Sequence, residues 1–328
     1  MSNFELIQFA KNNSIDRVIE TPLLSNIKVN KIIGKNIFIK PECLQVTGSF
    51  KFRGAWSALS YLKKENKIFN GVVAYSSGNH AQGIAAAAMV HNVPSVIVMP
   101  EDAPRMKIEN TLSYGAEVVY YDRMKEIREE IGERIAKERN FQLIRPYDDP
   151  LVIAGQGTCG LEIAQQANKL GINEAEVLVC CGGGGLSAGI ALALEELAPS
   201  FIVRTCEPEF FDDTARSLKS GNRETNLIPR KSICDAILTP TPGVLTFPIL
   251  EKLAGQGLVV SDDEVLTAIQ FLYENFKLVS EPGGAVALAA ALFSKKSLNK
   301  ENIIIVISGG NVDSDLFIQA LSKEKKIL

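Results

Sequence analysis

Lys51 lies between two phenylalanines, in the run Ser-Phe-Lys-Phe-Arg-Gly at residues 49–54. Apolar neighbours keep water away from an ammonium group, and this desolvation lowers the pKa of a lysine from its free value of about 10.4. A neutral lysine amine is a nucleophile that can form a Schiff base with a carbonyl compound. Taken alone, the run also fits a surface helix whose phenylalanines fill a core. A chemical role for Lys51 therefore depends on motifs elsewhere in the chain.

Four consecutive glycines at residues 182–185 follow a short apolar run and precede a helical pattern. Glycines let successive N–H groups turn toward an anion, and the N-terminus of the next helix adds a favourable dipole, so we expect a phosphate site. The spacing Gly183-x-Gly185-x-x-Ala188, with Glu207 about 20 residues later, also matches the dinucleotide-binding fingerprint. A NAD-binding oxidoreductase is therefore an alternative on this evidence.

Two polar turns follow strand patterns elsewhere in the chain, Ser-Ser-Gly-Asn-His at residues 76–80 and Ser-Gly-Gly-Asn at residues 308–311. The first can present N–H groups and hydroxyls to a carboxylate, although it can also be an ordinary helix cap. The second delivers Ser308 to the carboxyl end of an apolar strand, where open α/β sheets bind ligands. A neutral hydroxyl there can hydrogen-bond a ring nitrogen without protonating it.

Composition excludes several classes of function. The 328 residues are 46% hydrophobic and 22% charged, with a net charge of −3 and a pI of about 5.7, so nothing indicates nucleic-acid binding. We see no signal peptide and no apolar run of membrane-spanning length, and we expect a cytoplasmic protein without a membrane partner. Six cysteines without a Cys-x-x-Cys pair indicate free thiols, and two histidines are too few for a multi-histidine zinc site.

Short β-branched runs alternate with helical patterns through most of the chain, which predicts an α/β protein with parallel sheets. The polar stretch at residues 220–240 is expected to be a surface excursion. We expect strands at residues 36–40, 72–75, 95–99, 117–121, 141–145, 177–181, 202–206 and 303–307. We expect helices at residues 52–63, 81–89, 106–114, 124–138, 152–169, 187–197, 262–276 and 285–293.

Together these motifs resemble the pyridoxal-phosphate (PLP) enzymes of the tryptophan-synthase-β fold type, closest to the serine/threonine dehydratase and serine racemase family. The similar runs keep the family's order at residues 40–42, 49–55, 76–80, 153–158, 182–185, 281–282 and 308–311. The resemblance implies a two-lobed fold type II enzyme, each lobe a mostly parallel twisted sheet flanked by helices. It implies a large PLP-binding domain of residues 1–65 and 149–328, a small substrate-closing domain of residues 66–148, and a homodimer.

By the same resemblance, Lys51 carries PLP and later removes the α-proton of the substrate. Phe50 would pack against the cofactor ring, Asn79 would bind its hydroxyl, and Ser308 would contact its nitrogen. The resemblance gives a cofactor-binding set of Phe50, Lys51, Asn79, Gly182, Gly183, Gly184, Gly185, Glu281 and Ser308. It gives a substrate-binding set of Ser76, Ser77, Gly78, Asn79 and His80.

The implied reaction is the elimination of water and ammonia from a small β-hydroxy amino acid, L-serine or L-threonine, to give a 2-keto acid. Ser77 stands where racemases of the family also have serine, and a hydroxyl on the ring face opposite Lys51 would make it a second catalytic residue. Serine racemisation is therefore an alternative. Phe52 and the runs at residues 121–123 and 281–285 look more like the 3-hydroxyaspartate dehydratase branch, a further alternative.

The run Glu-Pro-Glu-Phe-Phe-Asp-Asp at residues 207–213 resembles the divalent-cation loop of the family. Glu207, Asp213 and the carbonyl of Phe211 would supply hard oxygen ligands for Mg²⁺ or Ca²⁺. The alternative interpretation is an acidic surface turn without a metal.

Overall fold

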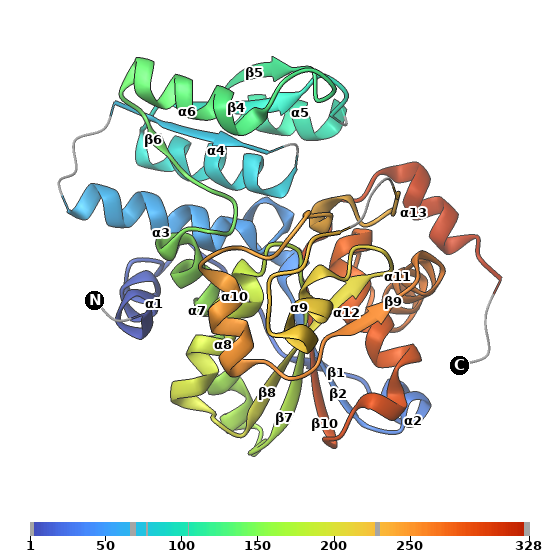
Figure 1. The fold of residues 1–328 in the computed structure, drawn as a ribbon. Helices are drawn as coiled ribbons and strands as arrows, with labels where there is room; N and C mark the ends of the chain where they lie inside the picture. Colours follow the sequence, from blue (N-terminus) through green and yellow to red (C-terminus); the bar gives the residue numbers. More distant parts are fainter. Residues whose placement is uncertain (1–2, 66–69, 77, 104, 227–229, 325–328) are drawn as a thin grey trace.

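The computed structural model describes residues 3–65, 70–76, 78–103, 105–226 and 230–324. Two separate sheets organise this part of the chain (Figure 1). One has six strands in the order β1-β2-β10-β7-β8-β9, and the other has four in the order β5-β4-β3-β6. Neighbouring strands are parallel except for β1 and β2. The strands are β1 Leu24–Ser25, β2 Asn36–Pro41, β3 Val72–Tyr75, β4 Ser95–Pro100, β5 Glu117–Tyr121, β6 Gln142–Leu143, β7 Ala175–Cys180, β8 Phe201–Pro208, β9 Leu258–Val260 and β10 Asn302–Ile307.

Helices cover both sheets and connect their strands, as parallel sheets require. Two of them show clear start signals: Asp149 caps α7 and precedes its Pro150, and Ser261 forms a capping box with Glu264 at the start of α11. The helices are α1 Asn3–Asn12, α2 Ile27–Ile33, α3 Lys51–Lys64, α4 Asn79–His91, α5 Arg105–Ser113, α6 Arg128–Arg139, α7 Pro150–Lys169, α8 Gly185–Leu197, α9 Asp213–Ser220, α10 Thr246–Leu253, α11 Asp262–Phe276, α12 Pro282–Phe293 and α13 Ser314–Leu321.

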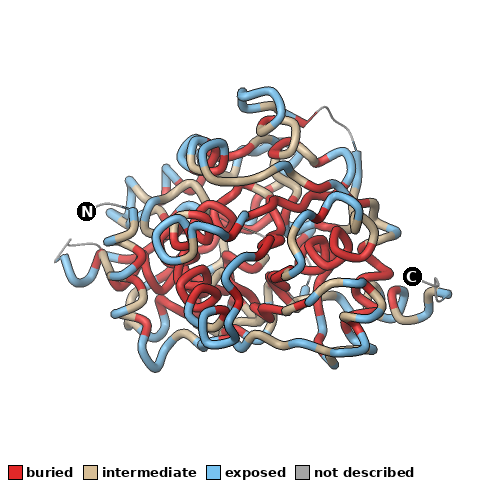
Figure 2. Tube along the Cα trace, turned by 90° about the horizontal axis from the view of Figure 1, so that it is seen from below, coloured by how far each residue is buried: buried red, intermediate tan, exposed pale blue. Residues whose placement is uncertain are grey.

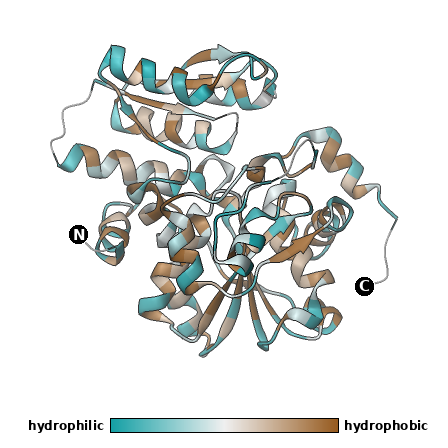
Figure 3. Ribbon diagram, viewed as in Figure 1, coloured by the Kyte–Doolittle hydropathy of each residue, from teal (hydrophilic) through white to brown (hydrophobic). Residues whose placement is uncertain are grey.

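The six-stranded sheet lies inside the larger part of the molecule. Its strand β10 is apolar on both faces, and residues 303–307 are all fully buried, as expected for a parallel strand covered on both sides. Helices α7 and α8 pack on each other, and α12 packs over β7, β8 and β10. The strands of this sheet accordingly stand out as hydrophobic between the helices in Figure 3.

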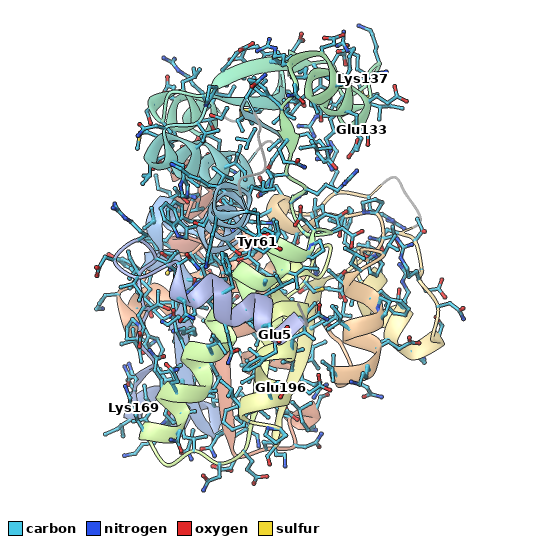
Figure 4. The ribbon with its side chains drawn as sticks, turned by 90° about the vertical axis from the view of Figure 1, so that its left-hand side faces the viewer. Glu5, Tyr61, Glu133, Lys137, Lys169 and Glu196 are labelled. Carbon is cyan, nitrogen blue, oxygen red and sulfur yellow. The ribbon has the colours of Figure 1, made fainter. Side chains whose placement is uncertain are left out.

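The four-stranded sheet also has helices on both faces. Along β3, Val72 and Ala74 join the core formed with α3 and α4, while Val73 and Tyr75 join the core under α6. This alternation is the period-2 pattern of a strand buried on both sides. Figure 2 shows the buried residues running through the middle of the molecule, with exposed segments outside. In Figure 4, Glu133 and Lys137 of α6 mark the four-stranded end, and Lys169 and Glu196 mark the opposite end.

The chain crosses between the sheets twice. It enters the four-stranded sheet after α3 and returns through residues 144–149 before α7. The strands of the smaller sheet fall between residues 72 and 143, but the division into a domain of residues 66–148 and a domain of residues 1–65 and 149–328 stays a prediction. In the described part of the chain, no helix combines the length and hydrophobicity that a membrane span requires.

The expected α/β architecture is confirmed, with differences in detail. Strands β1 and β9 and helices α1, α2, α9, α10 and α13 were not expected from the sequence. Strand β7 ends at Cys180, so Cys181 lies outside it rather than beside Cys180 in the strand. All six cysteines are free thiols, as expected, and all but Cys43 are buried.

Candidate active site

A pocket of about 140 Å³, here called the central pocket, lies at the carboxyl ends of parallel strands of both sheets. Residues of the four-stranded side line one part of it: Tyr75, Ser76, Gly78, Asn79, His80, Lys107 and Arg128. Residues of the six-stranded side line the rest, among them Phe50, Lys51, Gln156, Cys180, Gly182, Gly183, Gly184, Gly185, Glu281 and Ser308. The structure thus brings together the expected cofactor and substrate residues that it describes. Ser77 lies outside the described residues.

Lys51 begins helix α3 and points into the central pocket. Its Nζ donates a hydrogen bond to the carbonyl of Pro146 at 2.8 Å and lies 5.1 Å from the centre of the Phe50 ring. Burial lowers the pKa of Lys51 to about 8, although Cys180 and Glu281 oppose this shift. A far larger share of this amine is therefore neutral near pH 7 than in a free lysine.

Phe52, the other aromatic neighbour, has a different role. It is 2% exposed and packs in the core between α3 and α4, 5.9 Å from the ring of Trp56. The idea that two aromatics flank the amine is therefore wrong in part, because only Phe50 reaches it. Successive helical residues point about 100° apart, so both neighbours of Lys51 cannot face the same pocket.

The loop at residues 182–185 needs glycines because neighbouring residues pack closely against it. A Cβ on Gly183 would overlap the ring of Tyr147, and a Cβ on Gly182 would lie 3.0 Å from the carbonyl oxygen of Ile237. Gly184 has a φ of +89°, a left-handed conformation that favours glycine. The loop opens helix α8, so its N–H groups and the helix dipole form a cradle for an anion at the edge of the pocket.

Asn79 is fixed by two side chains from the other lobe. Its Nδ2 donates to Oε1 of Glu281 at 2.5 Å, and its Oδ1 accepts from Nδ2 of Asn311 at 2.8 Å. Burial raises the pKa of Glu281 to about 7, and its second oxygen, Oε2, has no hydrogen-bond partner within the described part of the chain. Asn311 was seen in the sequence only as part of a turn, but here it orients Asn79.

His80 is neutral and has a defined tautomer. Its Nε2 lies 3.1 Å from the carbonyl oxygen of Ile144, and because a carbonyl can only accept, Nε2 must carry the proton. Burial, reinforced by the nearby Lys51, lowers the pKa of His80 to about 3. At neutral pH the ring is therefore uncharged and has no proton on Nδ1, so it cannot serve as an acid from that atom.

Ser308 lies directly after strand β10, as the sequence predicts, and is 3% exposed. Its carbonyl accepts from the N–H of Phe50 at 3.0 Å, and its hydroxyl hydrogen-bonds the thiol of Cys180. On the opposite side, Ser76 Oγ accepts from the N–H of Gly78, which is the N-cap of α4. Both hydroxyls are neutral groups that can donate or accept without changing charge.

Sequence reasoning missed several charged and aromatic residues of the pocket. Lys107 Nζ is paired with Oδ2 of Asp235 at 2.7 Å, which links α5 of the smaller sheet to the segment Asp235–Ile237 of the larger one. Arg128, at the start of α6, lies 5.5 Å from the centre of the Tyr75 ring. No local pattern marks these cations, because each looks like a polar residue on a surface helix. The prediction that residues 220–240 lie only on the surface is wrong for the end of this segment, since Asp235, Ile237 and Thr239 line the pocket.

Gln156 is another missed residue. It is 1% exposed, lines the central pocket, and neither its Oε1 nor its Nε2 has a partner among the described residues. Burying an amide without hydrogen bonds is costly, which is a sign of a group that meets a ligand or water in the working protein. Its position in the shared run at residues 153–158 was the only signal in the sequence.

The expected metal ligands lie outside the central pocket, at the end of β8. Glu207 accepts from the N–H groups of Thr214 and Ala215 at 2.8 and 2.7 Å, and Asp213 Oδ1 accepts from Nδ2 of Asn226 at 2.6 Å. Burial raises the pKa of both carboxyl groups, that of Asp213 to about 6, and Asp213 Oδ2 has no partner in the part of the chain that the structure describes. Two buried carboxylates with an open oxygen fit a divalent cation, which would offset their mutual repulsion.

The position of Glu207 weighs against the dinucleotide alternative. Glu207 is fully buried and does not line the central pocket beside the glycine loop, so a ribose bound at that loop would not reach its carboxylate. Among the described residues, no group of three or more histidine, cysteine, aspartate or glutamate side chains forms a metal cluster. A cation at Glu207 and Asp213 would therefore need the Phe211 carbonyl and water to complete its shell, and the metal stays a prediction.

Comparisons with known proteins agree with this geometry. The family model described as "Pyridoxal-phosphate dependent enzyme" matches residues 15–309. The chain is 41% identical to the L-threo-3-hydroxyaspartate ammonia-lyase of Saccharomyces cerevisiae, over 95% of this chain and 94% of that protein. It is 40% identical to the serine racemase of Schizosaccharomyces pombe, over 93% of this chain and 92% of that protein.

Solved structures give the same result. A threonine deaminase from T.th. superposes with a TM-score of 0.88 at 41% identity, covering 94% of this chain and 98% of that one. The predicted two-lobed fold type II is thus confirmed, as is the predicted family. The chain belongs to the family of pyridoxal-phosphate dependent enzymes, in its branch of ammonia-lyases and racemases.

Proposed function

We propose that the protein is an ammonia-lyase that converts a small β-hydroxy amino acid, L-serine or L-threonine, to a 2-keto acid and ammonia. The observation that carries this proposal is the amine of Lys51. It is held in the same pocket as a glycine cradle for a phosphate, and its pKa of about 8 keeps part of it neutral.

The residues present fit PLP at both ends. The loop at residues 182–185 would hold the phosphate, Phe50 would cover one ring face, and the hydroxyl of Ser308 would meet the ring nitrogen. Asn79, oriented by Glu281 and Asn311, would bind the ring hydroxyl. The unpartnered oxygen of Glu281 and the unpartnered amide of Gln156 border this space, which supports a polar ligand there.

When bound, PLP supplies an electron sink that acidifies the α-proton of an amino acid. Lys51 then acts as the base, because its buried amine is neutral at a pH where a free lysine is charged. The carbonyl of Pro146 orients Nζ before the proton transfer. Ser308 would meet the ring nitrogen with a neutral hydroxyl that cannot protonate it, and this would favour elimination over transamination.

The start of α4 would bind the substrate carboxylate. The N–H groups of Asn79 and His80 lie at the N-terminus of this 13-residue helix, where the dipole favours an anion, while the N–H of the N-cap Gly78 donates to Ser76 Oγ. The hydroxyl of Ser76 is the adjacent polar group. The roles of Ser77, in substrate binding and as a second catalytic group, stay predictions.

A second candidate substrate is 3-hydroxyaspartate, which carries an additional carboxylate. Arg128 and Lys107 support it, because both cations line the pocket on the substrate side, and cations are the groups that bind such a carboxylate. A relative of 41% identity is named as an L-threo-3-hydroxyaspartate ammonia-lyase. Arg123, which belongs to the run at residues 121–123 that resembles this branch, pairs instead with Asp102 on the surface at 2.7 Å.

The deciding experiment is a keto-acid and ammonia assay with L-serine, L-threonine and each stereoisomer of 3-hydroxyaspartate. Lys51→Ala is the negative control, since it should abolish product and the visible absorbance of bound cofactor. Activity that survives Lys51→Ala contradicts the proposal. Arg128→Gln separates the two candidates, because it should impair turnover of 3-hydroxyaspartate at least about tenfold more than turnover of serine if a charged pair is lost. Chiral chromatography of the serine reaction tests racemisation.

We also propose that Glu207, Phe211 and Asp213 bind Mg²⁺ or Ca²⁺ and stabilise the loop between β8 and α9. Phe210 supports this, because its φ of +69° is a strained conformation for a bulky residue in this loop. A homodimer and a cytoplasmic location stay predictions, which size-exclusion chromatography with light scattering and cell fractionation can test.

A further inference from the structure

The return crossing at residues 144–149 contacts several walls of the central pocket. Ile144 accepts the hydrogen bond of His80, and Pro146 accepts that of Lys51. Tyr147 packs on Gly183 and Gly185, and Asp149 caps helix α7. Asp148 is different from these residues, because its side chain contacts a segment that no sequence motif marked.

Asp148 binds the backbone just before helix α10. Its Oδ2 accepts from the N–H of Val244 at 3.1 Å, and its Oδ1 accepts from the N–H of Leu245 at 2.8 Å. A Cβ on Gly243 would overlap Oδ1, so the carboxylate sits directly against this turn. Hydrogen bonds to an ionised carboxylate are stronger than neutral ones, and two of them fix the turn relative to the crossing.

The same turn holds the glycine loop. The hydroxyl of Thr246 donates to the carbonyl oxygen of Gly183 at 2.6 Å, and the N–H of Gly243 donates to the same oxygen at 3.2 Å. A Cβ on Gly184 would lie 2.8 Å from Thr246 Oγ1, so the side chain lies against the loop. One carbonyl oxygen of the loop thus receives two donors from one turn.

The two hydrogen bonds to the Gly183 carbonyl also fix the direction of the next N–H group, that of Gly184. In a planar trans peptide, the C=O of one residue and the N–H of the next point in opposite directions. Two donors that hold the Gly183 carbonyl toward the turn therefore direct the N–H of Gly184 away from the turn. A cradle of N–H groups binds an anion well only when those groups are oriented before the anion arrives.

We infer that Asp148, acting through Thr246 and the Gly183 carbonyl, is a positioning residue for the phosphate group of the cofactor. This inference rests on the proposed function, because it takes the glycine loop as the phosphate site. Asp148 is not among the residues that line the central pocket, so its effect would be indirect. Its effect should be confined to the phosphate and should not extend to the ring or the aldehyde.

The test compares PLP with pyridoxal, which has the same ring and aldehyde but no phosphate. The full chain is freed of cofactor and titrated with each compound, and binding is followed by visible absorbance. Asp148→Ala and Thr246→Val should each weaken PLP about tenfold or more, the usual scale for losing charge-assisted or buried hydrogen bonds, and leave pyridoxal affinity within about twofold. Asp148→Asn, a milder change, should give the same selectivity with a smaller loss.

The neighbouring residue gives a matched control. Asp149 also accepts two backbone N–H groups, those of Leu151 and Val152, but these belong to the first turn of α7 and not to the turn before α10. Asp149→Ala, which removes the cap of α7, should lower the melting temperature and leave the ratio of PLP to pyridoxal affinity unchanged. The double variant of Asp148→Ala with Thr246→Val should be little worse than either single variant, because both residues act on one carbonyl.

Each outcome is decisive. A loss limited to PLP supports the inference. Equal losses for PLP and pyridoxal overturn it, because they would show general damage to the pocket, and unchanged binding of both compounds overturns it as well. Failure of the proposed cofactor site looks different, since the wild-type chain would then bind neither compound in a manner that depends on Lys51. A chain that binds PLP but releases no ammonia from serine or threonine fails the proposed function in the keto-acid assay and leaves this test unaffected.

Discussion

Lys51 should react with aldehydes near neutral pH far more readily than an ordinary lysine. With a pKa of about 8, about a tenth of the amine is neutral at pH 7, whereas a lysine with a pKa of 10.5 is neutral in only about one molecule in 3,000. Only the neutral amine attacks an aldehyde, so this difference alone gives an advantage of about 300-fold. Burial is the main cause of the shift, and a nearby carboxylate opposes it.

The pH dependence gives the assay. Cofactor-free protein is mixed with pyridoxal, trapped with borohydride after a fixed short time, and the modified peptide is quantified by mass spectrometry. Modification of Lys51 should rise about tenfold per pH unit below pH 8 and level off above it. Lys64, exposed at the other end of helix α3, is the internal reference within each sample.

A second perturbation tests the electrostatic part of the reasoning. Glu281 has a pKa of about 7, so above that pH its carboxylate is charged and stabilises the ammonium form of Lys51. Glu281→Gln removes this charge, and the pH at which modification levels off should move below about 8. Modification of Lys51 that climbs steadily to about pH 10 in the wild-type protein, as for a free lysine, would refute the argument that burial makes this amine neutral.

Three further predictions concern other parts of the site. Gly183→Ala should lower PLP affinity at least about tenfold in a spectroscopic titration, because the added Cβ overlaps the Tyr147 ring, and Tyr147→Ala in the same chain should restore part of it. Lys107→Met should raise the KM for substrate with little change in global stability, about 1 kcal/mol at most by urea unfolding, because its partner Asp235 is 55% exposed and can return to water. The wild-type chain should gain melting temperature with Mg²⁺ or Ca²⁺, less so below about pH 6 because protons then compete for Asp213, and Asp213→Ala should be insensitive to both ions and to chelator.

Patterns that repeat over several residues allowed the best predictions. The strands at residues 72–75 and 117–121 and the helix at residues 262–276 have the bounds expected from the sequence. Strands β1 and β9 span two and three residues, too short for any period to be visible. Short segments of this kind are set by the sheet they join rather than by their own composition.

The site was predicted where chemistry leaves a local signature and missed where it depends on distance in the chain. Consecutive glycines and a lysine beside phenylalanine are visible in a few letters. The pair of Lys107 and Asp235 joins residues 128 positions apart, and each looks ordinary in its own segment. The direction of Phe52 was likewise decided by the packing of α3 against α4, which no local pattern reveals.

The central pocket draws its two kinds of residue from two different sheets, and this has a consequence for how the enzyme can change. The groups assigned to PLP, namely Lys51, the glycine loop and Ser308, belong mostly to the six-stranded side. The groups proposed to face the substrate, among them Lys107 and Arg128, come from helices of the four-stranded side. Substrate range can therefore change by mutation in one half of the molecule while the cofactor-binding half stays unchanged. A directed-evolution library restricted to residues 105–128, which include Lys107 and Arg128 but not Asn79, should alter the preferred amino acid without loss of the cofactor.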